Sequence, residues 1–128
     1  MYAARNGHTE IVRALLAAPG IDVNKADNYG GTAVMQAANE GHTEIVIALL
    51  AAPGIDVNKA DNGGYTAILL AAYKGHTEIV RALLAAPGID LNKRATDGDY
   101  KGYTALGISI DKNKHEAAAL LRAAGARE

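Results

Sequence analysis

The chain of 128 residues contains no cysteine, no tryptophan and no phenylalanine. The absence of cysteine excludes disulfide bridges and thiolate metal sites, and it is consistent with a reducing compartment. Because tyrosine is the only large aromatic residue present, the core has to be built from leucine, isoleucine, valine and alanine. Such a core suits closely packed helices, and the chain length allows one domain.

Neither sign of charge predominates, because Lys and Arg together number 13 and Asp and Glu number 14. This balance offers no electrostatic footprint for nucleic acid or for an anionic membrane surface. No apolar run approaches the roughly 18 residues of a membrane-spanning helix. The first residues, MYAARNGHTE, also lack the apolar segment of a signal peptide. We therefore expect an intracellular, cytoplasmic protein with no nucleic-acid or membrane partner.

What the sequence does contain is a repeat. The blocks Gly7–Asn28 and Gly41–Asn62 differ at one position in 22, and the same block begins again at Gly75. The starts at residues 7, 41 and 75 give a period of 34 residues. A fixed period of this size indicates one supersecondary unit that is stacked on copies of itself. Chains of this kind usually work by presenting a surface rather than a catalytic pocket.

Each unit is predicted to hold two short helices followed by an extended loop. In the middle unit the first helix begins after Thr32, whose hydroxyl can accept a hydrogen bond from the first turn, and it ends at Gly41 in the left-handed conformation. The second helix ends before Pro53. Its apolar residues form a single stripe: Ile45, Val46, Leu49 and Leu50. Neither helix can bury its apolar face alone, so the units must stack.

The units repeat the pattern Gly-His-x-x-Ile-Val-x-x-Leu-Leu, followed by Asp-Val-Asn and Asp-x-x-Gly-x-Thr, which resembles the ankyrin repeat over essentially the whole chain. The sequence departs from the family where Thr-Pro-Leu-His is replaced by Thr32-Ala33-Val34-Met35, and where Pro-Gly-Ile lengthens the unit by one residue. The resemblance implies an all-α ankyrin-repeat solenoid, in which helix-turn-helix units are joined by hairpin-like loops.

The spacing predicts a single ankyrin-repeat domain, 1–128. Its predicted parts are a partial N-terminal repeat (1–26), a full repeat (27–60), a full repeat with an inserted loop at 94–98 (61–98) and a C-terminal capping repeat (99–128). Thr66 and Thr104 are 38 residues apart, four more than the period of 34. The added residues are either a tolerated loop insertion or a finger beside the binding face. The start in mid-repeat indicates a fragment, a truncated gene product, or a protomer that self-associates through its uncapped N-terminal repeat.

The positions that vary between units are the candidate contact sites. The resemblance implies that a partner binds the hairpin tips and the concave face made by the first helices, where these positions fall. Most of the tyrosines lie there, and tyrosine is a frequent interface anchor. Alternatively, tyrosine merely suits a half-exposed turn. The predicted partner-binding residues are Tyr29, Tyr65, Tyr73, Tyr100, Tyr103, Arg5, Asn39, Glu40, Lys74 and Lys101; Asp111 and Lys112 occupy further varied positions.

Three rows of recurring polar residues are predicted to be structural. The histidines lie too far apart to share a metal ion, since stacked helices are roughly 8–10 Å apart, so each ring should bond backbone at its helix start. The asparagines should stabilise turns, although the resemblance also makes them candidates for hydroxylation. The lysines should form a solvated face. The rows are His8, His42 and His76; Asn24, Asn58 and Asn92; and Lys25, Lys59 and Lys93.

The sequence contains no recognisable nucleophile, base and orienter set, and no glycine-rich phosphate loop. We therefore predict no enzyme activity, no cofactor and no metal site. The main functional hypothesis is a protein–protein interaction module that binds a protein partner. The alternative is a structural fragment of a longer ankyrin array, or an engineered or reconstructed scaffold, with no ligand of its own. The near-identity of the copies fits either recent duplication or consensus design.

Overall fold

The computed structural model describes residues 2–128, although the side chains of Tyr2 and Arg5 fall outside that description. All the regular secondary structure in this part of the chain is helical. Over the same residues, no helix combines the length and the apolar character needed to cross a bilayer. In chain order the helices are α1 (Tyr2–Arg5), α2 (Thr9–Leu16), α3 (Ala33–Glu40), α4 (Thr43–Leu50), α5 (Ala67–Lys74), α6 (Thr77–Leu84), α7 (Ala105–Asp111) and α8 (His115–Ala123).

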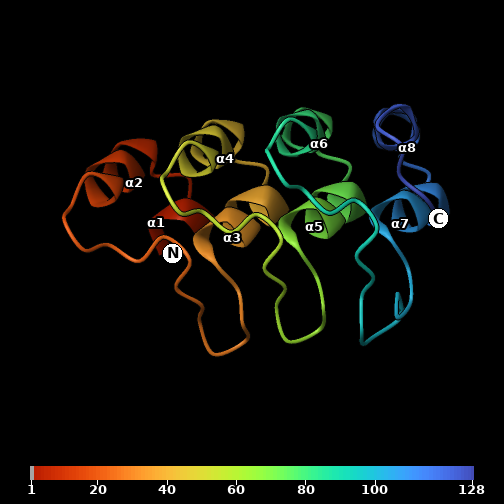
Figure 1. Ribbon diagram of the computed structural model, residues 1–128, viewed down its shortest axis with the longest axis horizontal. Coiled ribbons are helices and arrows are strands. Elements are labelled where there is room, and N and C mark those ends of the chain that lie inside the picture. Colours follow the sequence, from red (N-terminus) through yellow and green to blue (C-terminus); the bar gives the residue numbers. More distant parts are fainter. Residues whose placement is uncertain (1) are drawn as a thin grey trace.

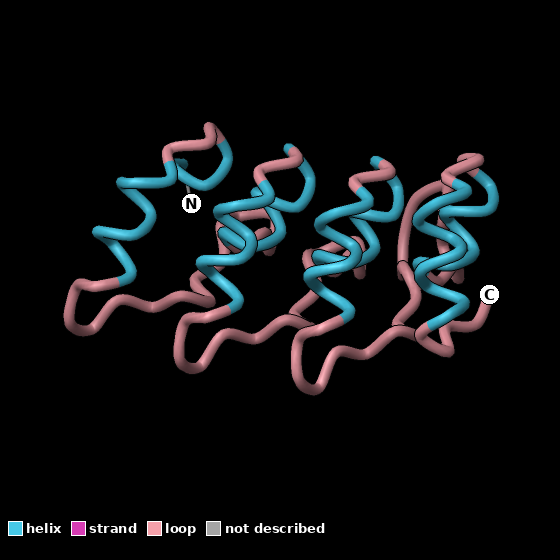
Figure 2. The backbone as a smooth tube through the Cα atoms, turned by 90° about the horizontal axis from the view of Figure 1, so that it is seen from above, coloured by secondary structure: helices cyan, strands magenta, loops and turns pink. Residues whose placement is uncertain are grey.

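The helices form two parallel rows, which are seen end-on in Figure 1. One row contains α1, α3, α5 and α7, and the other contains α2, α4, α6 and α8; the long loops project from the side of the first row. From above, these loops lie at one end of successive helix pairs (Figure 2). Contacts run along both rows, since α3 contacts α5 and α4 contacts α6. The predicted all-α solenoid is therefore confirmed.

Several helix boundaries follow from local residue chemistry, but Thr32 departs from the prediction. Gly41 ends α3 in the left-handed conformation with φ of 82°, as the sequence predicts. At the start of α5, the hydroxyl oxygen of Thr66 accepts a hydrogen bond from the backbone N–H of Leu69. Thr32 has the extended backbone of an N-cap residue, but its hydroxyl is buried and reaches no hydrogen-bond partner among the described residues. The capping bond predicted for Thr32 is therefore wrong.

A continuous aliphatic core runs along the stack. Alanines on α3 and α5 are fully buried, so the helices of that row can approach each other closely: Ala37, Ala38, Ala71 and Ala72. The second row contributes larger side chains with exposed fractions of 2% or less: Ile45, Leu49, Ile79 and Leu83. Burying one such side chain contributes about 1.5–3 kcal/mol, so packing between units provides the main stabilisation.

The outer face of α2 is the exception to this packing. The side chains of Ile11 and Leu15 are 53% and 43% exposed, whereas Ile45 and Leu49, at the same positions of the next unit, are 1% and 2% exposed. A hollow of about 150 Å³, lined mostly by apolar side chains such as Leu15 and Val23, opens beside them. In the described structure, this end of the stack presents apolar surface that every later unit buries.

The third long loop is extended at its tip. In the second loop the N–H of Asp61 donates to the carbonyl of Tyr65, and in the third loop the N–H of Ala95 donates to the carbonyl of Tyr103. The first pair is 4 positions apart (65 − 61) and the second is 8 apart (103 − 95), while Ala95 holds the register position of Asp61. The four added residues thus fall between Ala95 and Tyr103, a span that shares residues 96–98 with the insertion predicted at 94–98.

Candidate protein-binding surface

Four of the tyrosines singled out in the sequence gather near the C-terminal end of the stack. Tyr65 precedes α5, Tyr73 lies in its last turn, and Tyr100 and Tyr103 belong to the third long loop. The ring centroid of Tyr100 lies 5.6 Å from that of Tyr73 and 5.2 Å from that of Tyr103, with interplanar angles of 83° and 88°. Edge-to-face pairs of this kind are worth about 0.5–1.5 kcal/mol each beyond their burial. These four residues are called the tyrosine cluster below.

Two charged residues at the end of α7 fix the cluster in place. The hydroxyl of Tyr100 donates to Oδ2 of Asp111 over 2.9 Å. This hydrogen bond, with a smaller contribution from desolvation, raises the pKa of Tyr100 to about 12, so the phenol stays protonated and remains a donor at neutral pH. The Nζ atom of Lys112 lies over the ring of Tyr73, 4.9 Å from its centroid and within cation–π range.

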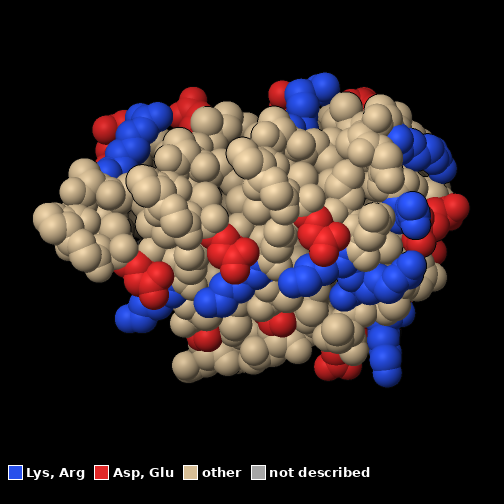
Figure 3. Space-filling model, viewed as in Figure 1, with Lys and Arg blue, Asp and Glu red and all other residues tan. Residues whose placement is uncertain are grey.

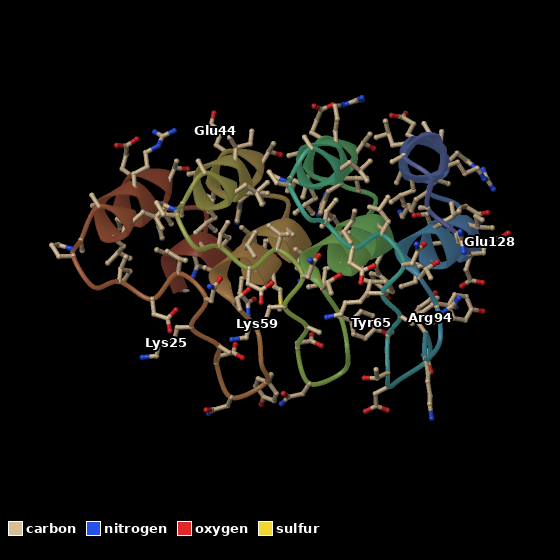
Figure 4. All side chains as sticks on the ribbon, viewed as in Figure 1. Lys25, Glu44, Lys59, Tyr65, Arg94 and Glu128 are labelled. Carbon is tan, nitrogen blue, oxygen red and sulfur yellow. The ribbon has the colours of Figure 1, made fainter. Side chains whose placement is uncertain are left out.

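The cluster borders a hollow of about 290 Å³. Figure 4 shows Tyr65 between the second and third long loops, where this hollow opens. Partial burial raises the pKa of Tyr65 above its ordinary value, and the nearby carboxylates of Asp61 and Asp99 raise the pKa further. The hollow therefore combines aromatic walls with negative charge. Its lining residues are Asn39, Asp61, Tyr65, Leu70, Tyr73, Asp99 and Tyr100.

The other predicted contact residues are more dispersed. Asn39 lines the hollow with the tyrosines, whereas Tyr29 lies at the tip of the first long loop and is 79% exposed. The side chain of Arg5 lies outside the described residues. The charged residues predicted to tune specificity are exposed: Glu40, Lys74 and Lys101. The structure thus brings Asn39 and four tyrosines together and leaves Tyr29 apart from them.

Three residues of this hollow are not among the contact residues that the sequence predicts: Asp61, Leu70 and Asp99. Asp61 also stabilises its own turn, because its Oδ1 accepts from the backbone N–H groups of Gly63 and Tyr65 at 2.9 Å. Leu70 occupies a helix position whose residue type changes from unit to unit, and this variation is the sequence signal that could have identified it as a contact residue. Asp99 directly precedes Tyr100 in the extended tip, where no earlier unit provides an equivalent residue.

The histidine row connects neighbouring units. The Nε2 atom of His76 lies 3.2 Å from the carbonyl oxygen of Asn39 in the preceding unit. Its ring also fills the space beside Gly41, where an added Cβ would lie 2.9 Å from a ring carbon. The predicted bond to backbone is therefore confirmed for His76, but that backbone belongs to the neighbouring unit rather than to its own helix. Within residues 2–128, no group of side chains is placed to hold a metal ion.

The asparagine row also joins successive units. Asn24 donates from Nδ2 to the carbonyl of Gly54 over 2.8 Å, and its Oδ1 accepts from the N–H of Asp56 over 2.7 Å. Asn58 makes the same pair of bonds one unit further on. The Nζ atom of Lys59 donates to the backbone carbonyl of Asn24 over 3.0 Å. The asparagines therefore bridge neighbouring units rather than stabilising single turns. Acidic and basic side chains alternate along the face seen in Figure 3.

Short helix pairs, left-handed glycine ends and hydrogen bonds from each loop to the next define a helical repeat solenoid that presents an extended surface. The family described as ankyrin repeats (3 copies) matches residues 1–95 and, in a second overlapping match, residues 60–127. The chain therefore belongs to the ankyrin repeat family, whose members are generally non-enzymatic protein–protein interaction modules. It matches none of the curated proteins with which it was compared.

Proposed function

We propose that this chain binds a protein partner through the tyrosine cluster, together with the adjoining loop tips and concave face. The observation that carries the proposal is the convergence of tyrosines from different chain segments, at positions that vary between units, on one partly exposed surface. Tyrosine supplies a large contact area with few rotatable bonds and a polar tip. Tyr29 lies apart from the cluster, at the tip of the first long loop, and its side chain, which is 79% exposed, is proposed as a separate contact.

The edge of this surface carries charges of both signs. Glu40 and Lys74 are exposed at the ends of α3 and α5, and Lys101 is exposed at the tip of the third loop. Exposed charges at the rim of an interface mainly affect the association rate and the choice of partner, and they contribute little net affinity. We assign these three residues to specificity and the tyrosines to affinity.

The first test is a quantitative pull-down from a lysate of the source cells. A variant with alanine at Tyr29, Tyr65, Tyr73, Tyr100 and Tyr103 is expected to lose a partner that the unchanged chain retains. The loss should be at least about tenfold, because truncating one anchor residue commonly costs 2 kcal/mol or more of binding energy. Circular dichroism and a thermal melt establish that the variant remains folded.

A matched control removes exposed side chains on the opposite row. Arg13 and Arg81 pair with Glu10 and Glu78 at 3.0 Å and 3.8 Å on the surface of α2 and α6, and exposed pairs of this kind contribute little stability. Alanine at these four positions should leave the partner bound. Equal recovery of every protein by all three chains would contradict the proposal. That result would favour a fragment of a longer array or a scaffold with no ligand of its own.

Self-association is a second candidate function, favoured by the exposed apolar face of α2. We propose that two copies associate through Ile11 and Leu15, which are 53% and 43% exposed. Replacing both residues by glutamate should abolish concentration-dependent association in sedimentation equilibrium, because the interface would then bury unpaired charges from both copies. Ile47→Glu is the matched control, since Ile47 is 54% exposed on α4, away from this end, and should leave association unchanged. A purely monomeric parent chain at high concentration would exclude this function.

A further inference from the structure

The hollow beside the tyrosine cluster indicates the chemistry of the partner, on the assumption that the proposed binding surface is correct. We infer that this hollow holds an arginine side chain of the partner protein, seated among the rings of Tyr65, Tyr73 and Tyr100 and paired with the carboxylates of Asp61 and Asp99. Three features of the hollow favour an arginine: its aromatic walls, its acidic groups and its size.

The aromatic walls are suited to a cation. The face of an aromatic ring carries negative potential and attracts an ammonium or guanidinium group within about 6 Å of its centroid. The cluster already shows this behaviour, because the Nζ atom of Lys112 lies 4.9 Å from the centroid of Tyr73. The hydrogen bond between Tyr100 and Asp111 orients a second ring almost perpendicular to the first, at 83°. The relative orientation of these two rings is therefore held by contacts within the chain.

The acidic groups add charge complementarity. Asp61 uses its Oδ1 atom to accept from two backbone N–H groups of its own turn, and its Oδ2 atom makes no hydrogen bond with another described residue. The carboxylate of Asp99 has neither a hydrogen bond nor an ion pair with the rest of the described chain. Both carboxylates lie close enough to Tyr65 to raise the pKa of its phenol. An anionic side chain would be repelled here, and an apolar one would desolvate Asp99 without compensation.

The size of the hollow favours one long side chain. Its volume of about 290 Å³ lies just below the roughly 300–1,000 Å³ of sites that enclose whole small molecules. Among cationic side chains, arginine fits better than lysine, because its flat guanidinium stacks on aromatic rings and presents a fork of donors to carboxylates. Lysine carries a compact charge, which stacks on rings and pairs with two carboxylates less effectively than a guanidinium does. Arginine is therefore the expected occupant.

The inference is tested by selecting peptides from a phage library of random dodecapeptides. The baits are the folded chain, the variant with alanine at all four positions of the tyrosine cluster, and the single variants Asp99→Asn and Asp56→Asn. Asp56 is an exposed carboxylate next to the asparagine row and does not line the hollow, so Asp56→Asn removes the same charge away from it. Peptides that bind the unchanged chain but not the alanine variant of the tyrosine cluster should share one arginine. Exchanging that arginine for leucine should weaken binding about tenfold, and Asp99→Asn should weaken it several-fold, with Asp56→Asn unchanged.

The other outcomes separate this inference from the proposed function. Cluster-dependent peptides without a shared arginine, or with an arginine that leucine replaces at no cost, would overturn the inference and leave the binding surface intact. Lysine that substitutes with equal affinity would show a general cation site and would overturn the preference for arginine. Loss of affinity in Asp56→Asn equal to that in Asp99→Asn would show only a long-range charge effect. Failure to select any cluster-dependent peptide would overturn the inference and the proposed surface together.

Discussion

Leu83→Ala is expected to lower the free energy of unfolding by about 2–5 kcal/mol. Leu83 lies on α6 with an exposed fraction of 0%, in the core shared by neighbouring units. Removing its branched end takes away buried apolar contacts and leaves a cavity that the packed helices only partly fill. For a domain of 128 residues, a loss of this size is a large part of the total stability. Urea denaturation followed by circular dichroism measures the change.

The chain contains a matched control for this substitution. Leu15 occupies the same position of an identical octapeptide, TEIVRALL, on α2, but its side chain is 43% exposed. Leu15→Ala should therefore cost only about 1 kcal/mol or less, since water already covers much of the residue. Helix propensity and local sequence are the same at both sites, so the difference isolates the packing between units. Equal losses at the two positions would contradict the stacking described for α6 or the exposure described for α2.

The second large effect is expected at a glycine in the second long loop. Gly64 has φ of 80°, and an added Cβ would lie 2.6 Å from both the backbone nitrogen and the Oγ1 of Thr96 in the third loop. Gly64→Ala should therefore strain the left-handed conformation and push the loops apart. The movement would disturb the hydrogen bond of 2.9 Å from the N–H of Thr96 to the carbonyl of Gly63. We expect a loss of about 2–4 kcal/mol in the free energy of unfolding.

Gly88→Ala separates the two causes of this loss. Gly88 has φ of 77°, and an added Cβ would meet nothing within 4 Å. Its substitution should therefore cost only the conformational strain, about 1–2 kcal/mol. Both variants are unfolded in parallel by heat and by urea. The additional loss in the free energy of unfolding for Gly64→Ala measures the effect of the close approach of the two loops. If the two variants are equally stable, the second and third loops are not packed as closely as the structure places them.

The sequence alone determined the repeating architecture, because the relevant signals are local and recur with the period. The apolar stripe, the stop at Pro-Gly and the left-handed glycine each specify one turn or one helix end, and all three depend only on near neighbours. The candidate surface could also be predicted in part, since the tyrosines occupy positions that differ between units while the flanking residues of the repeat stay the same. The contact between Tyr73 and Tyr100, 27 positions apart (100 − 73), could not be predicted from the sequence, because it depends on how the extended tip folds.

The bridging role of the asparagines was missed for a related reason. An Asn in a turn usually bonds to backbone nearby, whereas Asn24 bonds to Gly54 and Asp56 of the next unit. The segment TEIVRALL gives the sharpest contrast, because it occurs unchanged in α2 and in α6. Its second-last leucine is 43% exposed in the first copy and 0% exposed in the second. The sequence determined that both copies are amphipathic helices. Only the tertiary structure decided which one buries its apolar face, since burial depends on the neighbouring unit and not on the segment itself.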